Sequence, residues 1–317
     1  MCSNHLDPRR CKTTGSRADH LSTTLAVRTD EARSITEIAG FFEAGRDRLF
    51  GALALPLGDP SACLLISSPL FAEQARNYRR EVILARELAR RGIATFRYHY
   101  RGTGHSDGAG GDLSFPSLCA DAAAALEHLR ERCPGLPSAS LGTRLGAFVA
   151  ANVASDGAPL LLWDPIPDAG AFFADAVKAR QAGGMVTMRD PSSTDAADRE
   201  DDPWADGFLD ALGYRVPRSF EESFAGVSFP DCLGTRSHDV LIVTMVPRHE
   251  AMPRAGTVAE LIRDAGSAHV DLARVDGRLT WWTSRDSWDP DEDHPPTHEV
   301  VGRSADWLEL HVSREAA

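Results

Sequence analysis

The residues whose types and spacing could do chemistry lie between Leu141 and Ala147, where the chain reads Leu-Gly-Thr-Arg-Leu-Gly-Ala. In the pattern Gly-x-Ser-x-Gly, a strained turn between a strand and a helix presents a nucleophilic serine, and the glycines let the two backbones pass closely. Gly142 and Gly146 keep that frame, but Arg144 stands where the serine would be. An arginine stays protonated at ordinary pH and cannot attack a carbonyl, so the turn is predicted to lack its nucleophile.

The segments around this turn are predicted to alternate between strands and helices. Apolar runs predict strands at 49–57, 62–67, 93–98, 138–141, 160–163, 239–246 and 269–275. Helical spacing predicts helices at 77–91, 115–131 and 145–155, with Gly92 ending the first, and a last helix with Thr297 as its N-cap. This order predicts an α/β protein with a mainly parallel twisted sheet and helices on both faces. The run at 62–67 is apolar throughout, which favours a central strand.

The pattern also divides the chain. Residues 1–34 are polar and without periodic apolar spacing, so we expect a flexible N-terminal extension and regular structure from Ile35 onward. Residues 35–166 and 238–317 are predicted to form the α/β core. Residues 167–237, rich in Gly, Asp and Phe, interrupt the alternation and are predicted to be an inserted segment that caps the carboxyl edge of the sheet.

Composition narrows the classes of partner. The 317 residues are 43% hydrophobic and carry a formal net charge of -12, which argues against nucleic acid and anionic membranes and favours a small-molecule ligand or substrate. A protein partner or a second copy of the chain stays open. No 18-residue apolar run is present, and the six cysteines form no C-x-x-C pair, so we expect a cytoplasmic protein with reduced thiols and neither metal nor cofactor.

Three segments carry a resemblance to a known family: Ser68–Arg80, Tyr100–Gly108 (Tyr-Arg-Gly-Thr-Gly-His-Ser-Asp-Gly) and Gly142–Ala147. They resemble the α/β-hydrolase superfamily, in particular its serine-aminopeptidase-like branch. The closest resemblance is to the exosortase-system-associated hydrolase-like proteins, whose turn can also hold arginine. The resemblance implies an α/β-hydrolase fold and the place of a site, but names no substrate, because fold alone does not set activity.

In such a fold the acid and the histidine of a triad follow the nucleophile in the chain. Glu250 follows the strand at 239–246 and stands where the resemblance places the acid, although a solvated loop charge is equally consistent with it. His294 and His298 precede the last helix, where the resemblance places the base.

Asp164 directly follows the strand at 160–163 and is expected at the carboxyl edge of the sheet, where ligands bind. A cation at a helix N-terminus is disfavoured unless an anion compensates it. Arg144 is therefore predicted to pair with Asp164 or Glu250, or to hold the carboxylate or phosphate of a ligand.

Two further features bear on catalysis. Ser140 offers a shifted nucleophile two residues before Gly142, at the cost of a shorter strand. Ser68 lies where an oxyanion loop would follow its strand, so the candidate donors are the amides of Leu70 and Phe71 together with that of Leu145.

Three functions stay open from the sequence. The first is a binding or accessory protein with an α/β-hydrolase fold, no serine mechanism, and an acyl, ester or carboxylate ligand held between the core and the inserted segment. The second is an enzyme acting on ester or amide substrates through a histidine and acid pair, with Arg144 orienting the substrate. The third is ordinary serine hydrolysis through Ser140.

Overall fold

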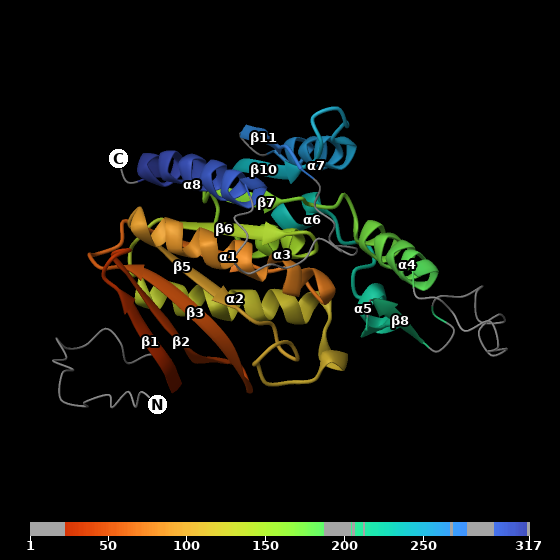
Figure 1. Ribbon diagram of the computed structural model, residues 1–317, viewed down its shortest axis with the longest axis horizontal. Coiled ribbons are helices and arrows are strands. Elements are labelled where there is room, and N and C mark those ends of the chain that lie inside the picture. The colour runs from red at the N-terminus through yellow and green to blue at the C-terminus, as the bar shows by residue number, and fades with distance from the viewer. Residues whose placement is uncertain are drawn as a thin grey trace.

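A nine-stranded sheet forms the centre of the computed structural model (Figure 1), which describes residues 23–186, 204, 207–211, 213–266, 269–277 and 295–315. Its spatial order is β1-β2-β3-β5-β4-β6-β7-β10-β11. These strands are β1 (Thr23–Asp30), β2 (Ile35–Ala44), β3 (Asp47–Pro56), β4 (Ala62–Ser67), β5 (Ile93–Tyr98), β6 (Ser138–Thr143), β7 (Leu160–Trp163), β10 (Asp239–Met245) and β11 (His269–Val275). The neighbours from β5 to β11 pair in parallel, whereas the pairs that join β1, β2, β3 and β5 are antiparallel. The predicted, mainly parallel sheet is confirmed.

Helices cover both faces of this sheet. The α-helices of the described residues are α1 (Ala72–Arg90), α2 (Phe115–Arg132), α3 (Gly146–Val153), α4 (Ala169–Val186), α5 (Arg218–Glu222), α6 (Phe229–Leu233), α7 (Pro253–Asp264) and α8 (Pro295–Glu315). The side chains of Leu64 and Ile66 pack in a cluster with α1 and α8, while Cys63 and Leu65 pack in another with α2, α3, α6 and α7. Successive residues of a strand point to opposite faces, so the fully buried β4 supplies both clusters. Its central position, between β5 and β6, agrees with the prediction.

The N-terminal prediction needs a correction. Residues 23–30 form β1, which pairs with β2, so regular structure begins before Ile35, while residues 1–22 of the predicted extension lie outside the described residues. The side chains of Leu25 and Val27 are exposed by 59% and 58%, and an edge strand of this kind leaves no buried apolar pattern for the sequence to reveal.

Two helices begin earlier than predicted. The first helix begins at Ala72 rather than at residue 77, because its first turns bury the polar side chains of Glu73 and Asn77 and so break the apolar periodicity. It ends as predicted, with Gly92 at a positive φ of 84° just after the C-cap. The last helix begins at Pro295, so Thr297 lies inside it and is not its N-cap.

The inserted segment contains α4, the hairpin β8 (Phe208–Ala211) and β9 (Tyr214–Pro217), α5 and α6. In Figure 1, α4, α5 and β8 gather at one end of the molecule. The ring of Phe71, just after β4, contacts the rings of Phe172, Tyr214 and Phe220 at centroid distances of 6.1, 6.0 and 5.3 Å. The segment therefore packs at the carboxyl end of β4. Across the described part of the chain, no helix has the length and apolar character needed to cross a bilayer.

Candidate functional site

The turn between β6 and α3 has the geometry of a nucleophile elbow, with Arg144 at its tip. Arg144 has a φ of 55°, a left-handed conformation that non-glycine residues rarely adopt. A Cβ on Gly142 would lie 2.4 Å from the carbonyl oxygen of Gly146, and a Cβ on Gly146 would lie 2.3 Å from that of Ser67. The glycine frame is thus required by the close passage of α3 over β6 and β4, whatever residue stands at the tip.

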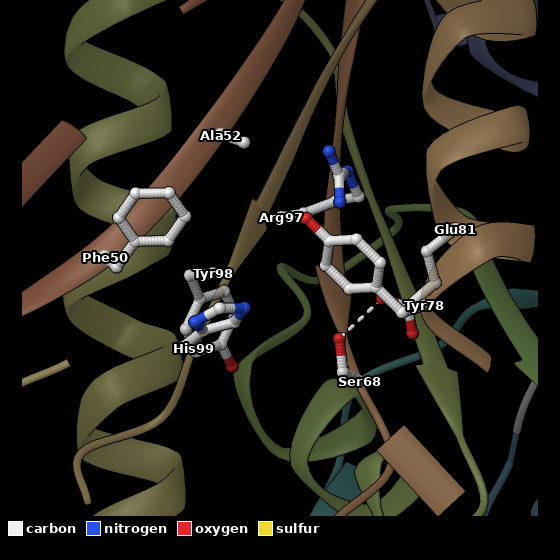
Figure 2. A pocket seen from close by; sticks show the side chains of 8 residues that line it. All are labelled: Phe50, Ala52, Ser68, Tyr78, Glu81, Arg97, Tyr98 and His99. Atoms are coloured by element: carbon white, nitrogen blue, oxygen red, sulfur yellow. Dashed lines mark hydrogen bonds between the residues drawn. The ribbon is translucent and has the colours of Figure 1, made fainter. Parts of the chain in front are cut away.

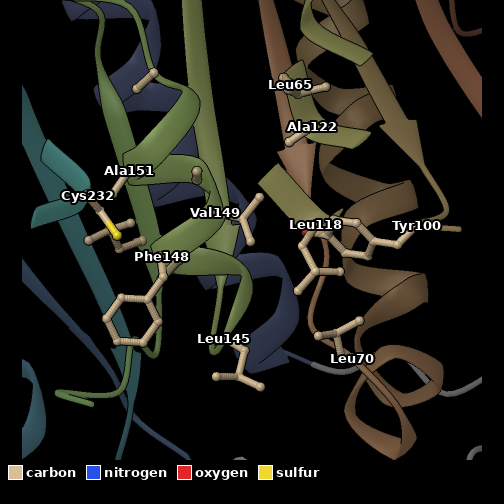
Figure 3. Packing of buried hydrophobic residues seen from close by; sticks show 14 of the residues in the cluster. Leu65, Leu70, Tyr100, Leu118, Ala122, Leu145, Phe148, Val149, Ala151 and Cys232 are labelled. Carbon is tan, nitrogen blue, oxygen red and sulfur yellow. The ribbon is translucent and has the colours of Figure 1, made fainter. Parts of the chain in front are cut away.

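The rest of α3 anchors this turn in the apolar core. Leu145 and Phe148 are fully buried, and Figure 3 shows them among Val149, Leu118 and Leu70 in the cluster on the α3 face of the sheet. The backbone of the tip is also fixed, because the Arg144 amide donates to the Trp163 carbonyl oxygen at 3.1 Å. The direction in which the Arg144 side chain leaves the turn is therefore set by packing around it.

Three carboxylates surround the Arg144 guanidinium, which is 1% exposed. Its Nε donates to Glu73 Oε1 at 3.0 Å, its Nη2 donates to Asp175 Oδ2 at 2.8 Å, and its Nη1 lies 3.7 Å from Asp164 Oδ2. The structure thus brings Arg144 and Asp164 together, as the sequence suggested. Glu73, in the first turn of α1, and Asp175, on α4, are partners that the sequence did not reveal.

A second arginine completes this group of charges. Arg254, at the start of α7, makes two hydrogen bonds of 2.7 Å to the two oxygens of Asp175. Asp164 has a φ of 43° and accepts a hydrogen bond of 2.7 Å from the Thr244 hydroxyl of β10. We call Arg144, Glu73, Asp164, Asp175 and Arg254 the elbow charge cluster. It joins the elbow to α1, to the end of β7, to α4 and to α7.

The protonation of the elbow charge cluster follows from burial. Desolvation raises the pKa of Glu73 to about 7, although the charge and hydrogen bond of Arg144 favour its ionised form. Burial would lower the pKa of Arg144, but Glu73, Asp164 and Asp175 together raise it above its usual value. Desolvation of Asp175 is likewise outweighed by Arg254 and Arg144, which hold its pKa below the usual range. The two arginines therefore face two or three negative charges, depending on whether Glu73 carries a proton.

The other sequence candidates lie in different surroundings. Ser140 is 3% exposed within β6, paired between Leu65 and Leu160, rather than at the tip of the turn. Glu250 lies in the exposed loop after β10, with its Oε1 3.8 Å from Nε2 of His249. His298 is exposed on the first turns of α8. His294 lies outside the described residues, so its role remains a prediction.

The candidate oxyanion donors frame the same turn. Leu145 caps the N-terminus of α3, directly after Arg144, and Phe71 caps that of α1 with a φ of 57°. Leu70 is 1% exposed and packs in the core. The hydroxyl of Ser68 donates to Glu81 Oε2 at 2.7 Å, so its side chain is engaged with α1 rather than with Arg144.

Comparisons with known proteins agree with this architecture. Residues 60–166 match the model of the serine aminopeptidase S33 family. Est1E from Butyrivibrio proteoclasticus, solved with ferulic acid bound, has a TM-score of 0.58 and 14% sequence identity, covering 86% of this chain and 99% of its own. The chain has an α/β-hydrolase fold.

Two other solved structures resemble this chain to a similar degree. Mouse α/β-hydrolase domain-containing protein 10 has a TM-score of 0.57 and 14% identity, covering 86% of this chain and 98% of its own. A thermostable carboxyl esterase from Bacillus coagulans has a TM-score of 0.57 and 14% identity, covering 87% and 99%. No curated protein sequence matches the chain significantly. Structural similarity at this level of sequence identity shows the fold, and the chemistry has to be argued from the residues of the site.

Proposed function

We propose that this α/β-hydrolase-fold protein has lost serine hydrolysis and acts as a binding or accessory protein, with Arg144 as the structural link between the elbow and the inserted segment. The observation that carries the proposal is that the Arg144 guanidinium already has carboxylate partners within the protein. Nε and Nη2 of its buried guanidinium donate to Glu73 and Asp175, and Nη1 faces Asp164. The resemblance to hydrolase-like proteins with arginine at this turn supports the same proposal.

The elbow charge cluster is also poorly suited to acyl transfer. Hydrolysis of an ester passes through an oxyanion, which an active site stabilises with donors and positive charge. Here the carboxylates of Glu73, Asp164 and Asp175 surround position 144, where an active hydrolase has its nucleophile. The positive charge of the Arg144 guanidinium is already paired with them. An anionic intermediate at the elbow would meet these negative charges, and the cations of the described cluster, Arg144 and Arg254, are already paired with carboxylates.

The same partners argue against Arg144 as a ligand clamp. A carboxylate or phosphate ligand would compete with Glu73 and Asp175 for the guanidinium, and displacing Glu73 would leave a buried carboxylate without an ion-pair partner among the described residues. A small acyl or ester ligand between the core and the inserted segment would therefore meet the amides of Phe71 and Leu145 rather than Arg144.

The test is a fluorophosphonate probe read by intact mass, combined with turnover of short-chain esters. We expect neither an adduct nor turnover in the wild-type protein, in Ser140→Ala or in Arg144→Ser, since a triad also needs a placed base and acid. Circular dichroism of each variant checks that it is folded, and Arg144→Ala is the matched control for Arg144→Ser.

Two results would overturn the proposal. A wild-type adduct that Ser140→Ala abolishes would identify a shifted serine nucleophile. Ester turnover by Arg144→Ser above that of Arg144→Ala would show that an acid and a base are already in place around the turn, as the histidine and acid alternative requires.

A further inference from the structure

A second polar site lies between α1 and the strands β3 and β5 (Figure 2). The register places its floor, because Ala52 of β3 pairs with Arg97 of β5, and the His99 amide donates to the Phe50 carbonyl oxygen at 2.9 Å. Tyr78 and Glu81 line it from α1. The cleft has room for about one water molecule.

Arg97 is the unusual member of this cleft. Its side chain is 8% exposed, yet its Nε has no hydrogen-bond partner among the described residues. The guanidinium carbon lies 5.2 Å from the centroid of the Tyr78 ring, and the charge of Arg97 interacts with Glu81, beyond ion-pair distance, and with His99. A buried donor without an acceptor is costly, so the Nε–H group of Arg97 favours an incoming acceptor.

Glu81 cannot supply that acceptor in its present geometry. Its Oε1 accepts from Asn77 Nδ2 and its Oε2 accepts from the Ser68 hydroxyl, both at 2.7 Å. These two bonds hold the carboxylate toward α1 and the end of β4, and Figure 2 shows the bond from Ser68. Burial raises the pKa of Glu81 to about 7, so near neutral pH its negative charge only partly offsets Arg97.

Flat rings form the rim. Phe50 lies 5.2 Å from the ring of His99 and 5.0 Å from that of His105, and the two imidazoles stack at 5.7 Å. Desolvation and the neighbouring His105 and Arg97 lower the pKa of His99 to about 4, so His99 is neutral near pH 7. Tyr78, 40% exposed, covers Arg97 from the solvent side and can turn aside without disturbing the core.

We propose that this cleft binds a small organic carboxylate with a planar ring, whose carboxylate accepts a hydrogen bond from Arg97 Nε while the ring packs against Phe50 and His99. A guanidinium binds a carboxylate with good geometry, and aromatic side chains bind flat rings. Binding requires Tyr78 to move outward and thereby enlarge the cleft. Benzoate binding at Arg97 and ester turnover at the elbow are measured separately, so loss of one does not decide the other.

Benzoate is the probe, and benzamide is its neutral counterpart. In protein labelled with ¹⁵N-arginine, we expect benzoate to shift one arginine Nε–H resonance saturably, with a dissociation constant on the order of 1 mM, and benzamide to leave it in place. Arg97→Met should remove that resonance and weaken benzoate binding at least about tenfold, since a charged hydrogen bond is lost. Arg28→Met, at an exposed arginine of β1, is the matched control and should bind as the wild type does.

A second variant keeps the test decisive if Arg97→Met does not fold. Ala52→Met fills the floor of the cleft but retains Arg97, and it should block benzoate to a similar extent. Unchanged benzoate binding in the folded variants, or no saturable shift in the wild type, would overturn the proposal. Equal competition by inorganic phosphate or acetate would also overturn it, because the ring would then contribute nothing.

Discussion

Replacing Arg144 by methionine tests the elbow charge cluster most directly. The substitution keeps an unbranched side chain at the tip but removes the cation. The loss of stability should come mainly from Glu73, whose carboxylate would remain buried without its ion-pair partner. Asp175 keeps its two bonds to Arg254 and Asp164 keeps that to Thr244, whereas Glu73 is 0% exposed and Arg144 is its only ion-pair partner in the described chain. Removing one partner of a buried ion pair costs about 3–5 kcal/mol, so we expect a loss of this size in the free energy of unfolding at pH 8.

The loss should depend on pH because Glu73 can take up a proton. Its pKa is already about 7 beside Arg144 and would rise further without it. At pH 6 the carboxyl is then neutral in the folded variant, and the loss should be smaller than at pH 8 by at least about 1 kcal/mol. Adding Glu73→Gln to Arg144→Met should recover at least about 1 kcal/mol at pH 8, since no carboxylate is then left unpaired.

Urea unfolding followed by circular dichroism at pH 6 and pH 8 measures these differences, provided the slope m is unchanged. Arg28→Met is the control for loss of an exposed arginine and should stay within about 0.5 kcal/mol of the wild type. A loss below about 1 kcal/mol for Arg144→Met at pH 8, or no recovery in the double variant, would refute the view that Arg144 compensates a buried carboxylate.

Two further predictions concern Glu73 and Glu81, and the glycine frame. Both buried carboxyls have a folded-state pKa raised from about 4.5 to about 7, so the folded protein holds more protons than the unfolded chain between these values. The free energy of unfolding should therefore fall as pH rises from about 4.5 to about 7, by up to about 3 kcal/mol per group. Urea titrations should show a smaller fall for Glu73→Gln and for Glu81→Gln. A rise in stability across this pH range would contradict the assignment. Gly146→Ala places a Cβ 2.3 Å from the Ser67 carbonyl oxygen and should lower the free energy of unfolding by at least about 2 kcal/mol or prevent folding. Gly256→Ala on α7 is the control, because its Cβ meets no atom within 4 Å, and it should raise stability by about 0.5–1 kcal/mol. Similar thermal midpoints for the two variants would show that α3 can move away from β4.

The sequence predicted the elements that are buried by continuous apolar runs. The bounds of β4, β5, β7 and β11 agree with the prediction, because each is a short apolar or alternating run set between turn residues. The elbow was also predictable, since the glycines at 142 and 146 are required by contacts that any such turn makes.

The partners of Arg144 could not be predicted in the same way. Glu73 lies 71 residues before it and Asp175 lies 31 residues after it, and each is brought to the elbow by the packing of a whole helix. Glu73 resembles any acidic residue in the first turn of a helix, a position that carboxylates favour without a buried partner. Asp164 could be predicted as a partner from the sequence because it directly follows a strand, and the carboxyl ends of parallel strands meet at one edge of the sheet.

Two of the contacts that join the inserted segment to the core differ in their chemistry. One is electrostatic, through Asp175 with Arg144 and Arg254, and the other is aromatic, through Phe71 with Phe172, Tyr214 and Phe220. A single attachment would let the segment swivel about it, whereas two attachments set its orientation as well as its position. Solvent conditions act on the two points differently. Concentrated salt screens the pair of the half-exposed Arg254 with Asp175 more than that of the buried Arg144, while sulfate strengthens the burial of the aromatic rings. The segment should therefore keep its place when either of these two attachments is weakened, all the more because Phe148 of α3 also stacks on Phe229 of α6.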